Sequence, residues 1–237
     1  MIVDRPKARS LVNAIISAHF GPKAISVLEA GGGDFSRITQ ARNINVSRIT
    51  VVDIDQSQLD RNNYANFKIK ADLQDLSLED KYDLIEVIYV LEHIKDVEKA
   101  LSNITEACSN DGLIVISCPY MYSLSGIVTR FTPHWFHVFF RKYVSGEKNA
   151  GKEGYPPFRT FYNPLIAPSR LEKFLNEGGF STELRVFFES KIYKRIGSMK
   201  FPIIAIISVI NIFTPKSYNA RNGEYCIVFR KKIPNQS

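Results

Sequence analysis

Residues 27–36 read Val27-Leu28-Glu29-Ala30-Gly31-Gly32-Gly33-Asp34-Phe35-Ser36 and join an apolar run to a predicted helix through three consecutive glycines. Glycine permits a tight turn and lets the backbone approach a ligand that a Cβ atom would exclude. The free amide groups at the start of the next helix favour an electron-rich or anionic group. This pattern indicates a nucleotide site at the end of a strand, although a glycine turn that merely joins a strand to a helix would look the same.

Strands and helices are predicted to alternate around this turn. The predicted strands are short, rich in Val and Ile and mostly without in/out alternation, which is typical of strands buried on both faces. Such alternation favours a doubly wound α/β fold whose ligands lie at the carboxyl ends of parallel strands. The seven expected strands are residues 25–29, 48–53, 66–69, 82–88, 112–117, 181–188 and 224–231. The expected helices are 10–20, 36–44, 56–64, 95–108 and one that restarts at Pro168, with Ser169 as its cap, and stops at Gly178.

Length and composition bound the class of protein. A chain of 237 residues with 45% hydrophobic and 23% charged residues fits a single globular domain, residues 1–237, with insertions. Cys108, Cys118 and Cys226 are scattered, so we expect a reducing compartment and no metal site. The first six residues lack the apolar core of a signal peptide, which favours a cytoplasmic location.

The charge of the chain is unevenly distributed. Residues 1–119 hold 13 Lys and Arg against 17 Asp and Glu, residues 120–200 hold 13 against 6, and residues 201–237 hold 5 against 1. An acidic first half followed by a basic second half predicts an anionic partner, such as a phosphorylated substrate, a nucleic acid or a membrane surface. A solvated basic face without a partner is the alternative.

Two segments interrupt the alternation after Pro119. Residues 120–167 are rich in aromatic and basic side chains, and an insertion of this length is more often a functional lid than an idle loop. Residues 191–221 form an apolar helical insertion before the last strand, and its run at 201–213 is too short to span a bilayer. Because Lys and Arg flank that run, it is either a core helix or subunit contact, or an element at an anionic membrane surface.

Carboxylates follow two of the predicted strands. Asp53 ends the second strand, twenty residues after Gly33, where it can accept both hydroxyls of a ribose, and Asp55 is the alternative. After the third strand, Asp72 can meet an exocyclic amine of adenine while Leu73 packs on the ring, or Asp72 is only a helix cap or loop residue.

Glu29 separates two kinds of nucleotide site. A strand that binds nicotinamide is usually apolar up to its glycines, whereas a carboxylate at this place suits a ligand with a positive charge, such as an ammonium or a sulfonium. Buried without a partner, that carboxylate is costly, so a cation or a donor must be supplied.

Five motifs then stand in order over residues 24–119: Val-Leu-Glu-Ala-Gly-Gly-Gly at 27–33, Val-Val-Asp-Ile-Asp at 51–55, Ala-Asp-Leu at 71–73, Tyr-Asp-Leu-Ile-Glu-Val-Ile-Tyr-Val-Leu-Glu-His-Ile at 82–94 and Asn-Asp-Gly-Leu-Ile-Val-Ile-Ser-Cys-Pro at 110–119. Together they resemble the class I S-adenosylmethionine-dependent methyltransferases, in the ubiquinone-biosynthesis-like branch (methyltransferase type 11). The resemblance implies a Rossmann-like, mostly parallel, seven-stranded sheet with an antiparallel last strand and a lid insertion. It also implies S-adenosylmethionine as cofactor and S-adenosylhomocysteine as product.

The resemblance further implies residue roles. The glycines would pass beneath the methionine part of the cofactor, the first acid would lie near it, and the acids after the second and third strands would bind ribose and adenine. The turn after the fourth strand would form the floor of the methyl-transfer site. The implied cofactor-binding residues are Glu29, Gly31, Gly33, Asp53, Ile54, Asp72, Leu73 and Tyr89.

His93 and His134 are the candidate catalytic residues. Under the resemblance His93 lies near the cofactor sulfur, where it shapes the substrate site, relays a proton or only holds the turn. His134 stands beside Trp135 in the lid, as base, phosphate contact or a residue without a role. Methyl transfer is an in-line displacement, so alignment supplies most of the acceleration, and a base is needed only for a hydroxyl or protonated amine.

We therefore expect a methyltransferase that acts on a small-molecule, glycan or lipid-linked acceptor, anionic in character and methylated at oxygen. A nicotinamide oxidoreductase, a non-catalytic binding protein with a cofactor fold and a nucleic-acid methyltransferase are the alternatives. The last is disfavoured because no Asn/Asp-Pro-Pro-aromatic segment follows the fourth strand. The expected location is cytoplasmic, either free or peripheral at an anionic membrane surface.

Overall fold

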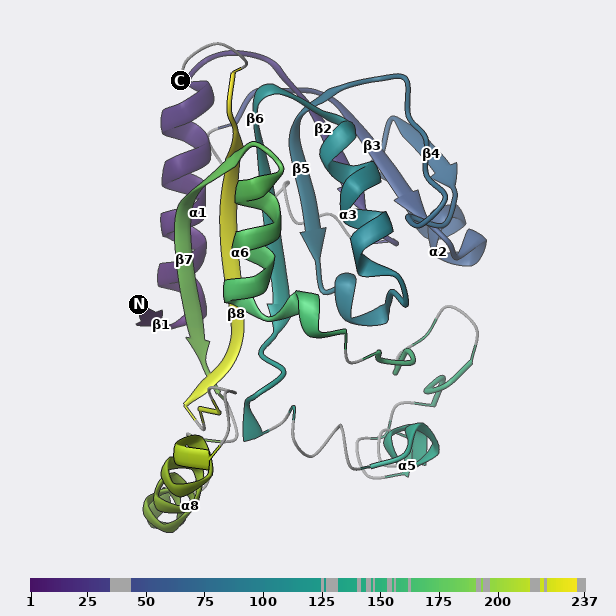
Figure 1. Cartoon of the computed structure of the whole chain (residues 1–237). Helices are drawn as coiled ribbons and strands as arrows, with labels where there is room; N and C mark the ends of the chain where they lie inside the picture. Colours follow the sequence, from purple (N-terminus) through teal and green to yellow (C-terminus); the bar gives the residue numbers. More distant parts are fainter. Residues whose placement is uncertain are drawn as a thin grey trace.

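The fold is an eight-stranded sheet with the order β1-β7-β8-β6-β5-β2-β3-β4, covered by helices on both faces (Figure 1). The computed structural model describes residues 1–34, 44–124, 126, 132–139, 142–143, 146, 148–152, 155, 157–161, 163–190, 193, 197–213, 218–219 and 221–233. The strands are β1 (Ile2–Val3), β2 (Ile25–Ala30), β3 (Val46–Asp53), β4 (Phe67–Lys70), β5 (Tyr82–Ile88), β6 (Cys108–Pro119), β7 (Phe180–Glu189) and β8 (Asn222–Lys231). The helices are α1 (Arg5–Phe20), α2 (Gln56–Arg61), η2 (Leu91–His93), α3 (Val97–Glu106), α5 (His134–Phe139), η4 (Pro164–Ile166), α6 (Pro168–Glu177), η5 (Gly197–Met199) and α8 (Lys200–Phe213).

The sheet is parallel except for its last strand. β2 pairs in parallel with β3 and β5, β3 with β4, and β5 with β6, whereas β8 runs antiparallel between β6 and β7. The predicted α/β class and the antiparallel last strand are therefore confirmed. The predicted number of strands differs by one, because the two-residue strand β1 pairs in parallel with β7 at the edge.

Alternate residues of the central strands enter two separate cores. Leu28 belongs to the cluster beneath α3 and α6, and Val27 belongs to the cluster beneath α1, with both side chains fully buried. Helices on both faces require this burial of successive residues, which explains why the central strands lack an in/out pattern. Figure 1 shows α3 and α6 over one face of the sheet.

Local capping explains where two helices start. α1 begins at Arg5, earlier than the predicted residue 10, because the Asp4 side chain accepts from the Lys7 amide at 2.8 Å and Pro6 fits the first turn. The prediction that Ser169 caps α6 is wrong, since Pro168 is its first residue and Ala167 the cap. Proline has no amide proton that would need a cap there. The predicted helix 36–44 lies almost wholly in residues 35–43, outside the described residues.

Among the helices in the described ranges, none combines the length and the apolar character needed to cross a membrane.

Glu92 is a buried acid in the turn η2 after β5. Its side chain is 4% exposed, and its Oε2 has no hydrogen-bond partner among the described residues. Burial raises its pKa to about 7, with a smaller contribution from the negative charge of Glu224. The carboxyl group is therefore neutral in the folded protein under mildly acidic conditions.

The raised pKa of Glu92 makes the free energy of unfolding depend on pH. Below its ordinary pKa of 4.5 the group is protonated in both states, whereas between pH 4.5 and about 7 only the folded state keeps the proton. Stability therefore falls as the pH rises through this window, by about 3 kcal/mol. We expect Glu92→Gln to remove that loss, measured as urea unfolding free energies at a series of pH values.

The matched control for this measurement is Glu98→Gln, which changes an exposed carboxyl group in the first turn of α3. This control should keep the pH profile of the original protein. Equal pH profiles for Glu92→Gln and the original chain would contradict the raised pKa.

Candidate active site

Two adjoining cavities lie at the carboxyl ends of the parallel strands. The larger cavity, of about 350 Å³, is lined by residues that follow β2, β3, β4 and β5 and by Phe158, Arg159 and Phe161 of the lid segment. The smaller cavity, of about 220 Å³, lies against the glycine turn and shares Gly31 and Tyr89 with the larger one. Ligand sites of open α/β sheets occupy this edge, and the larger volume falls in the range of small-molecule sites.

The glycine turn needs glycine at two positions. Gly31 has a φ of +72°, and a Cβ atom on it would lie 2.6 Å from the side chain of Val90. Gly33 has a φ of +58°, and its amide donates to Asp53 Oδ2 at 3.0 Å. Residues with side chains rarely adopt such φ values, so the turn and the end of β3 are held together in a form that only glycine adopts readily.

Asp53 is the acid that the turn fixes in place. It is 8% exposed, lines the larger cavity, and accepts from the Asp55 amide at 2.9 Å in addition to Gly33. Burial raises its pKa, and the bonds from Asp55 and Gly33 partly oppose that shift. Because a carboxylate has about four acceptor positions, these two bonds leave capacity for the hydroxyls of a ribose.

Asp55, the alternative, is committed to the start of α2. Its Oδ1 accepts from Ser57 Oγ at 2.6 Å and from the Gln58 amide at 3.2 Å, and these bonds lower its pKa. This geometry favours Asp53 over Asp55 as the ribose ligand, which stays a prediction.

The smaller cavity is acidic. Glu29, Asp34 and Glu86 line it, and Glu29 is the register neighbour of Glu86 on β5. Glu29 is 3% exposed, and its Oε2 accepts from the Tyr64 hydroxyl at 2.6 Å, which is the donor that its burial requires. Carboxylates facing one cavity suit a ligand that carries an ammonium or a sulfonium.

Tyr89 stands between the two cavities in a strained conformation. Its φ is +58°, which is unusual for a residue with a side chain. Its hydroxyl donates to Glu224 Oε2 at 2.7 Å, and Glu224 also forms an ion pair with Arg5 at the start of α1. Burial, together with the charge of Glu224, raises the pKa of Tyr89 far above its ordinary value, so this phenol stays protonated.

The predicted adenine end of the site lies after β4. Asp72 accepts from the amide and side chain of Gln74, so it also shapes its own loop. Leu73 is 5% exposed beside it, while Ile54 lines the same cavity at 64% exposure. An exposed apolar side chain in a cavity wall is available to pack on a ring.

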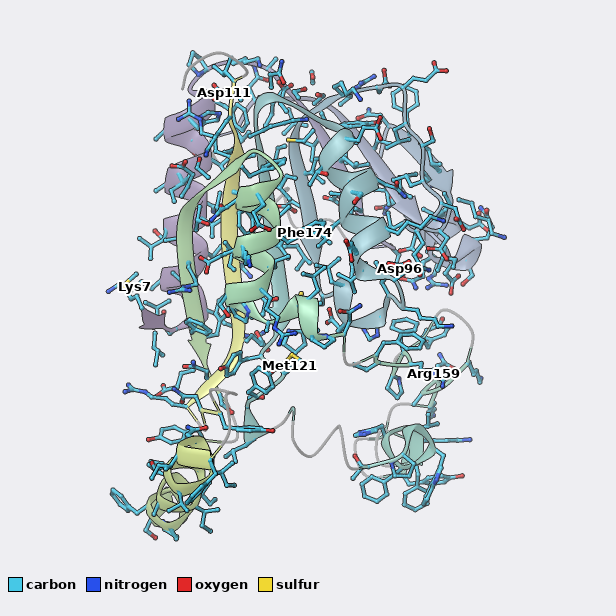
Figure 2. All side chains as sticks on the ribbon, viewed as in Figure 1. Lys7, Asp96, Asp111, Met121, Arg159 and Phe174 are labelled. Carbon is cyan, nitrogen blue, oxygen red and sulfur yellow. The ribbon has the colours of Figure 1, made fainter. Side chains whose placement is uncertain are left out.

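His93 connects the sheet to the lid segment. Its Nδ1 lies 2.8 Å from the Arg159 carbonyl oxygen, its ring meets Phe158 edge to face, and the Phe161 amide donates to the Glu92 carbonyl at 2.7 Å. A carbonyl only accepts, so Nδ1 carries the proton and Nε2 keeps its lone pair. Burial lowers the pKa of His93, which keeps the ring neutral at physiological pH. Figure 2 shows Arg159 beyond the carboxyl edge of the sheet.

His134 is only partly described. It is the first residue of α5, but its side chain lies outside the described residues, so its catalytic role stays a prediction. In the same helix, His137 Nε2 lies 2.8 Å from Thr132 Oγ1.

Seven of the eight predicted cofactor-binding residues and His93 thus line the two cavities, while their roles stay predictions. The eighth, Gly33, lines neither cavity but holds Asp53 through its amide. Sequence reasoning missed three residues of this site. Tyr64 donates a hydrogen bond to Glu29, and Glu86 and Gln58 line the cavities. No local pattern marks these three, since each matters only through a residue distant in the sequence. Within the described part of the chain, no group of three metal-binding side chains is assembled.

Comparison with known proteins identifies the family. A family of methyltransferase domains matches residues 5–144, more than half of the chain. No curated protein sequence matches this chain.

Solved structures with the same fold have low sequence identity. A SAM-dependent methyltransferase from Archaeoglobus fulgidus superimposes with a TM-score of 0.55 at 16% identity, covering 94% of this chain and 94% of that one. Magnesium protoporphyrin IX methyltransferase from Synechocystis PCC 6803, with bound S-adenosylhomocysteine, has a TM-score of 0.54 at 15% identity, covering 95% and 83%. An N-methyltransferase from Bradyrhizobium japonicum WM9, also with S-adenosylhomocysteine, has a TM-score of 0.52 at 15% identity, covering 96% and 89%.

These findings confirm the resemblance to the class I S-adenosylmethionine-dependent methyltransferases and agree with S-adenosylmethionine as the cofactor, whereas the ubiquinone-biosynthesis-like branch stays a prediction. The chain belongs to the methyltransferase-domain family, with the fold of the S-adenosylmethionine-dependent enzymes.

Proposed function

We propose that this enzyme methylates a hydroxyl group of an anionic small-molecule, glycan or lipid-linked acceptor, with S-adenosylmethionine as donor. The observation that supports this most is the bond between the Gly33 amide and Asp53, which holds Asp53 in the wall of the larger cavity, next to the acidic smaller one. Glu29, Asp34 and Glu86 match the positive charges of the donor, and the glycine turn leaves room where a Cβ atom would collide. When bound, S-adenosylmethionine supplies an electrophilic methyl group on a cationic sulfur.

The residues of this chain would bind, orient and deprotonate. Asp53 would hold the ribose hydroxyls, and Ile54 and Leu73 would enclose the adenine ring. His93 would take the proton of the acceptor hydroxyl on Nε2, because its Nδ1 proton is held by the Arg159 carbonyl. A hydroxyl acceptor needs such a base, as a protonated amine does, and the proposal takes the hydroxyl as the acceptor because neutral His93 can accept its proton.

The charge of the acceptor follows from the lid. Arg159 lines the larger cavity, and residues 120–200 hold 13 Lys and Arg against 6 Asp and Glu. This excess favours a negatively charged acceptor, and the proposed location is cytoplasmic with peripheral contact to an anionic membrane.

A methyl-labelling experiment tests the function. The purified enzyme is incubated with S-adenosylmethionine labelled in its methyl group and an extract of envelope lipids and glycans. Label in anionic lipids or glycans that resists mild base, as a methyl ether does, would support the proposal. Label in added nucleic acid, or cofactor binding without any transfer, would favour the nucleic-acid or the non-catalytic alternative and overturn it.

Gly31→Ala should weaken cofactor binding. The new Cβ atom would push Val90, which lines the larger cavity, and would strain a backbone with a φ of +72°. We expect a loss of S-adenosylmethionine affinity of about tenfold or more, equal to about 1.4 kcal/mol, measured by isothermal titration calorimetry.

The control is Gly21→Ala, which has a similar φ of +55° but nothing within 4 Å of the added Cβ atom and no place in the cavities. It should lose about 1–2 kcal/mol of stability through the strained φ alone, without losing affinity. Equal affinities for the two variants would show that the close approach at Gly31 does not matter for binding.

His93→Asn should separate the hydrogen bond of this residue to the lid segment from its proposed role as a base. Asparagine can donate to the Arg159 carbonyl in place of Nδ1 but offers no basic nitrogen at the position of Nε2. We expect unchanged cofactor affinity and a fall in kcat of about a hundredfold or more with the labelled acceptor fraction. In the original enzyme the rate should decline toward acid below the ordinary histidine pKa of 6.5, because protonation removes the base and burial lowers this pKa.

His19→Asn provides the control, since His19 bonds the Asp111 carbonyl away from both cavities. It should leave kcat unchanged. If the His93→Asn enzyme kept its full kcat, His93 would not be the base, and its role would be limited to holding the lid segment.

A further inference from the structure

The helix α8 is apolar around most of its surface and exposed to solvent. Ile206, Ile212 and Phe213 are 60%, 76% and 81% exposed, and Phe201 is 66% exposed. Among its described side chains Ile207 is buried, at 7%. Figure 1 shows α8 projecting beyond the carboxyl edge of the sheet, away from both packed faces.

A second exposed apolar element lies beyond the same edge. In and after α5, Trp135 is 67% exposed, Phe139 50% and Tyr143 66% (Figure 1). Trp135 is the one tryptophan of the chain. Tryptophan and tyrosine are the side chains that favour the boundary between water and a bilayer.

The position of α8 relative to the sheet is fixed by polar contacts. Asn211 donates to the Tyr218 carbonyl at 2.8 Å and accepts from the Tyr218 amide at 2.9 Å. The Tyr218 ring meets Tyr122 edge to face at 5.3 Å, and the Asn219 amide donates to the Tyr122 carbonyl at 3.1 Å. Tyr122 follows β6 by three residues, so α8 is tied to the carboxyl edge where the cavities lie.

The charge around α8 selects the partner. Residues 190–223 contain no Asp or Glu, and they contain six basic residues, Lys191, Lys194, Arg195, Lys200, Lys216 and Arg221. A second copy of this chain docked through α8 would bring two such segments together, which like charges oppose. An anionic lipid surface attracts them, and each basic residue near such a surface adds to binding.

The length of α8 sets the depth of insertion. Its 14 residues extend about 21 Å at 1.5 Å per residue, less than the hydrocarbon core of about 30 Å. An amphipathic surface helix has a charged face, whereas α8 offers apolar side chains to most directions. Such a helix gains from immersion in the acyl chains of one leaflet.

We propose that α8 inserts into one leaflet of an anionic membrane, with α5 as a second anchor, so that the cavity edge faces the lipid headgroups. The acceptor would then be an anionic lipid-linked molecule taken from that surface. This identification of the acceptor rests on the proposed function, whereas the docking itself does not.

Vesicle binding tests the docking. The full chain is sedimented with vesicles of phosphatidylcholine alone and of phosphatidylcholine with phosphatidylglycerol, and the fluorescence of Trp135 is recorded. We expect binding to the anionic vesicles, weakened by salt, with a blue shift of the Trp135 emission. The partition coefficient of the double variant Ile206→Ser/Ile212→Ser onto anionic vesicles should be at least about tenfold lower, because two apolar side chains that would be buried in the hydrocarbon are replaced by polar ones.

Phe67→Ser is the matched control, since Phe67 is 55% exposed at the start of β4 and distant from α8 in the sequence. It should bind vesicles like the original chain. No binding to anionic vesicles, or an equal loss in the control and in the α8 variant, would overturn the proposal. So would light scattering that shows a lipid-free dimer of the original chain and a monomer of the α8 variant.

Methyl transfer and cofactor titration on the same samples keep the two proposals apart. Labelled methyl transfer without vesicle binding would overturn the docking and leave the proposed function intact. Vesicle binding without methyl transfer would overturn the proposed function and leave the docking intact.

Discussion

The hydrogen bond from the Gly33 amide to Asp53 is the contact on which the site depends. It joins the turn after β2 to the end of β3, so that two segments twenty residues apart form one wall. The bond requires the Gly33 amide to point toward β3, which the φ of +58° provides and a side chain would oppose. The turn lines the acidic smaller cavity and Asp53 lines the larger one, so the bond connects two places that suit different parts of a ligand.

The buried and half-buried acids around the site are each stabilised in a different way. Glu29 accepts a bond from Tyr64, Asp53 accepts two backbone amides, and Glu224 accepts from Tyr89 and pairs with Arg5. Glu92 is instead stabilised in its protonated, neutral form, because burial raises its pKa. Hydrogen bonds thus hold three of these carboxyl groups at the carboxyl edge, and such a set of acids suits a cationic donor rather than the pyrophosphate of a dinucleotide.

Much of the fold follows from local sequence. Runs of Val and Ile predict the central strands to within a few residues, since burial on both faces leaves an unmistakable composition. β1 escapes prediction because two residues form a strand only through pairing with β7, almost the whole chain away. The start of α6 at Pro168 agrees with the prediction, but Ser169 is not its cap, because a proline can open a helix without any side-chain cap.

The site is predictable to the extent that its residues lie in contiguous motifs. The glycines, Asp53 and Asp72 stand at strand ends, where topology alone brings them together. The roles of Tyr64 and Glu92 depend on tertiary contacts. The Tyr64 hydroxyl bonds Glu29, and Glu92 is buried only in the folded chain. Periodicity contains no information about either contact.

The lid segment links the two ends of the proposed reaction. Residues 158–161 are held to η2 by two bonds, from the Phe161 amide to the Glu92 carbonyl and between His93 and the Arg159 carbonyl. The first bond involves only backbone atoms, so it places the lid without regard to side chains, whereas the second fixes the tautomer of His93. The contact that holds this segment beside the larger cavity therefore also leaves Nε2 with its lone pair. Under the proposed function, the contact that holds residues 158–161 against η2 would also prepare His93 as the base, and displacing this segment from η2 would release both.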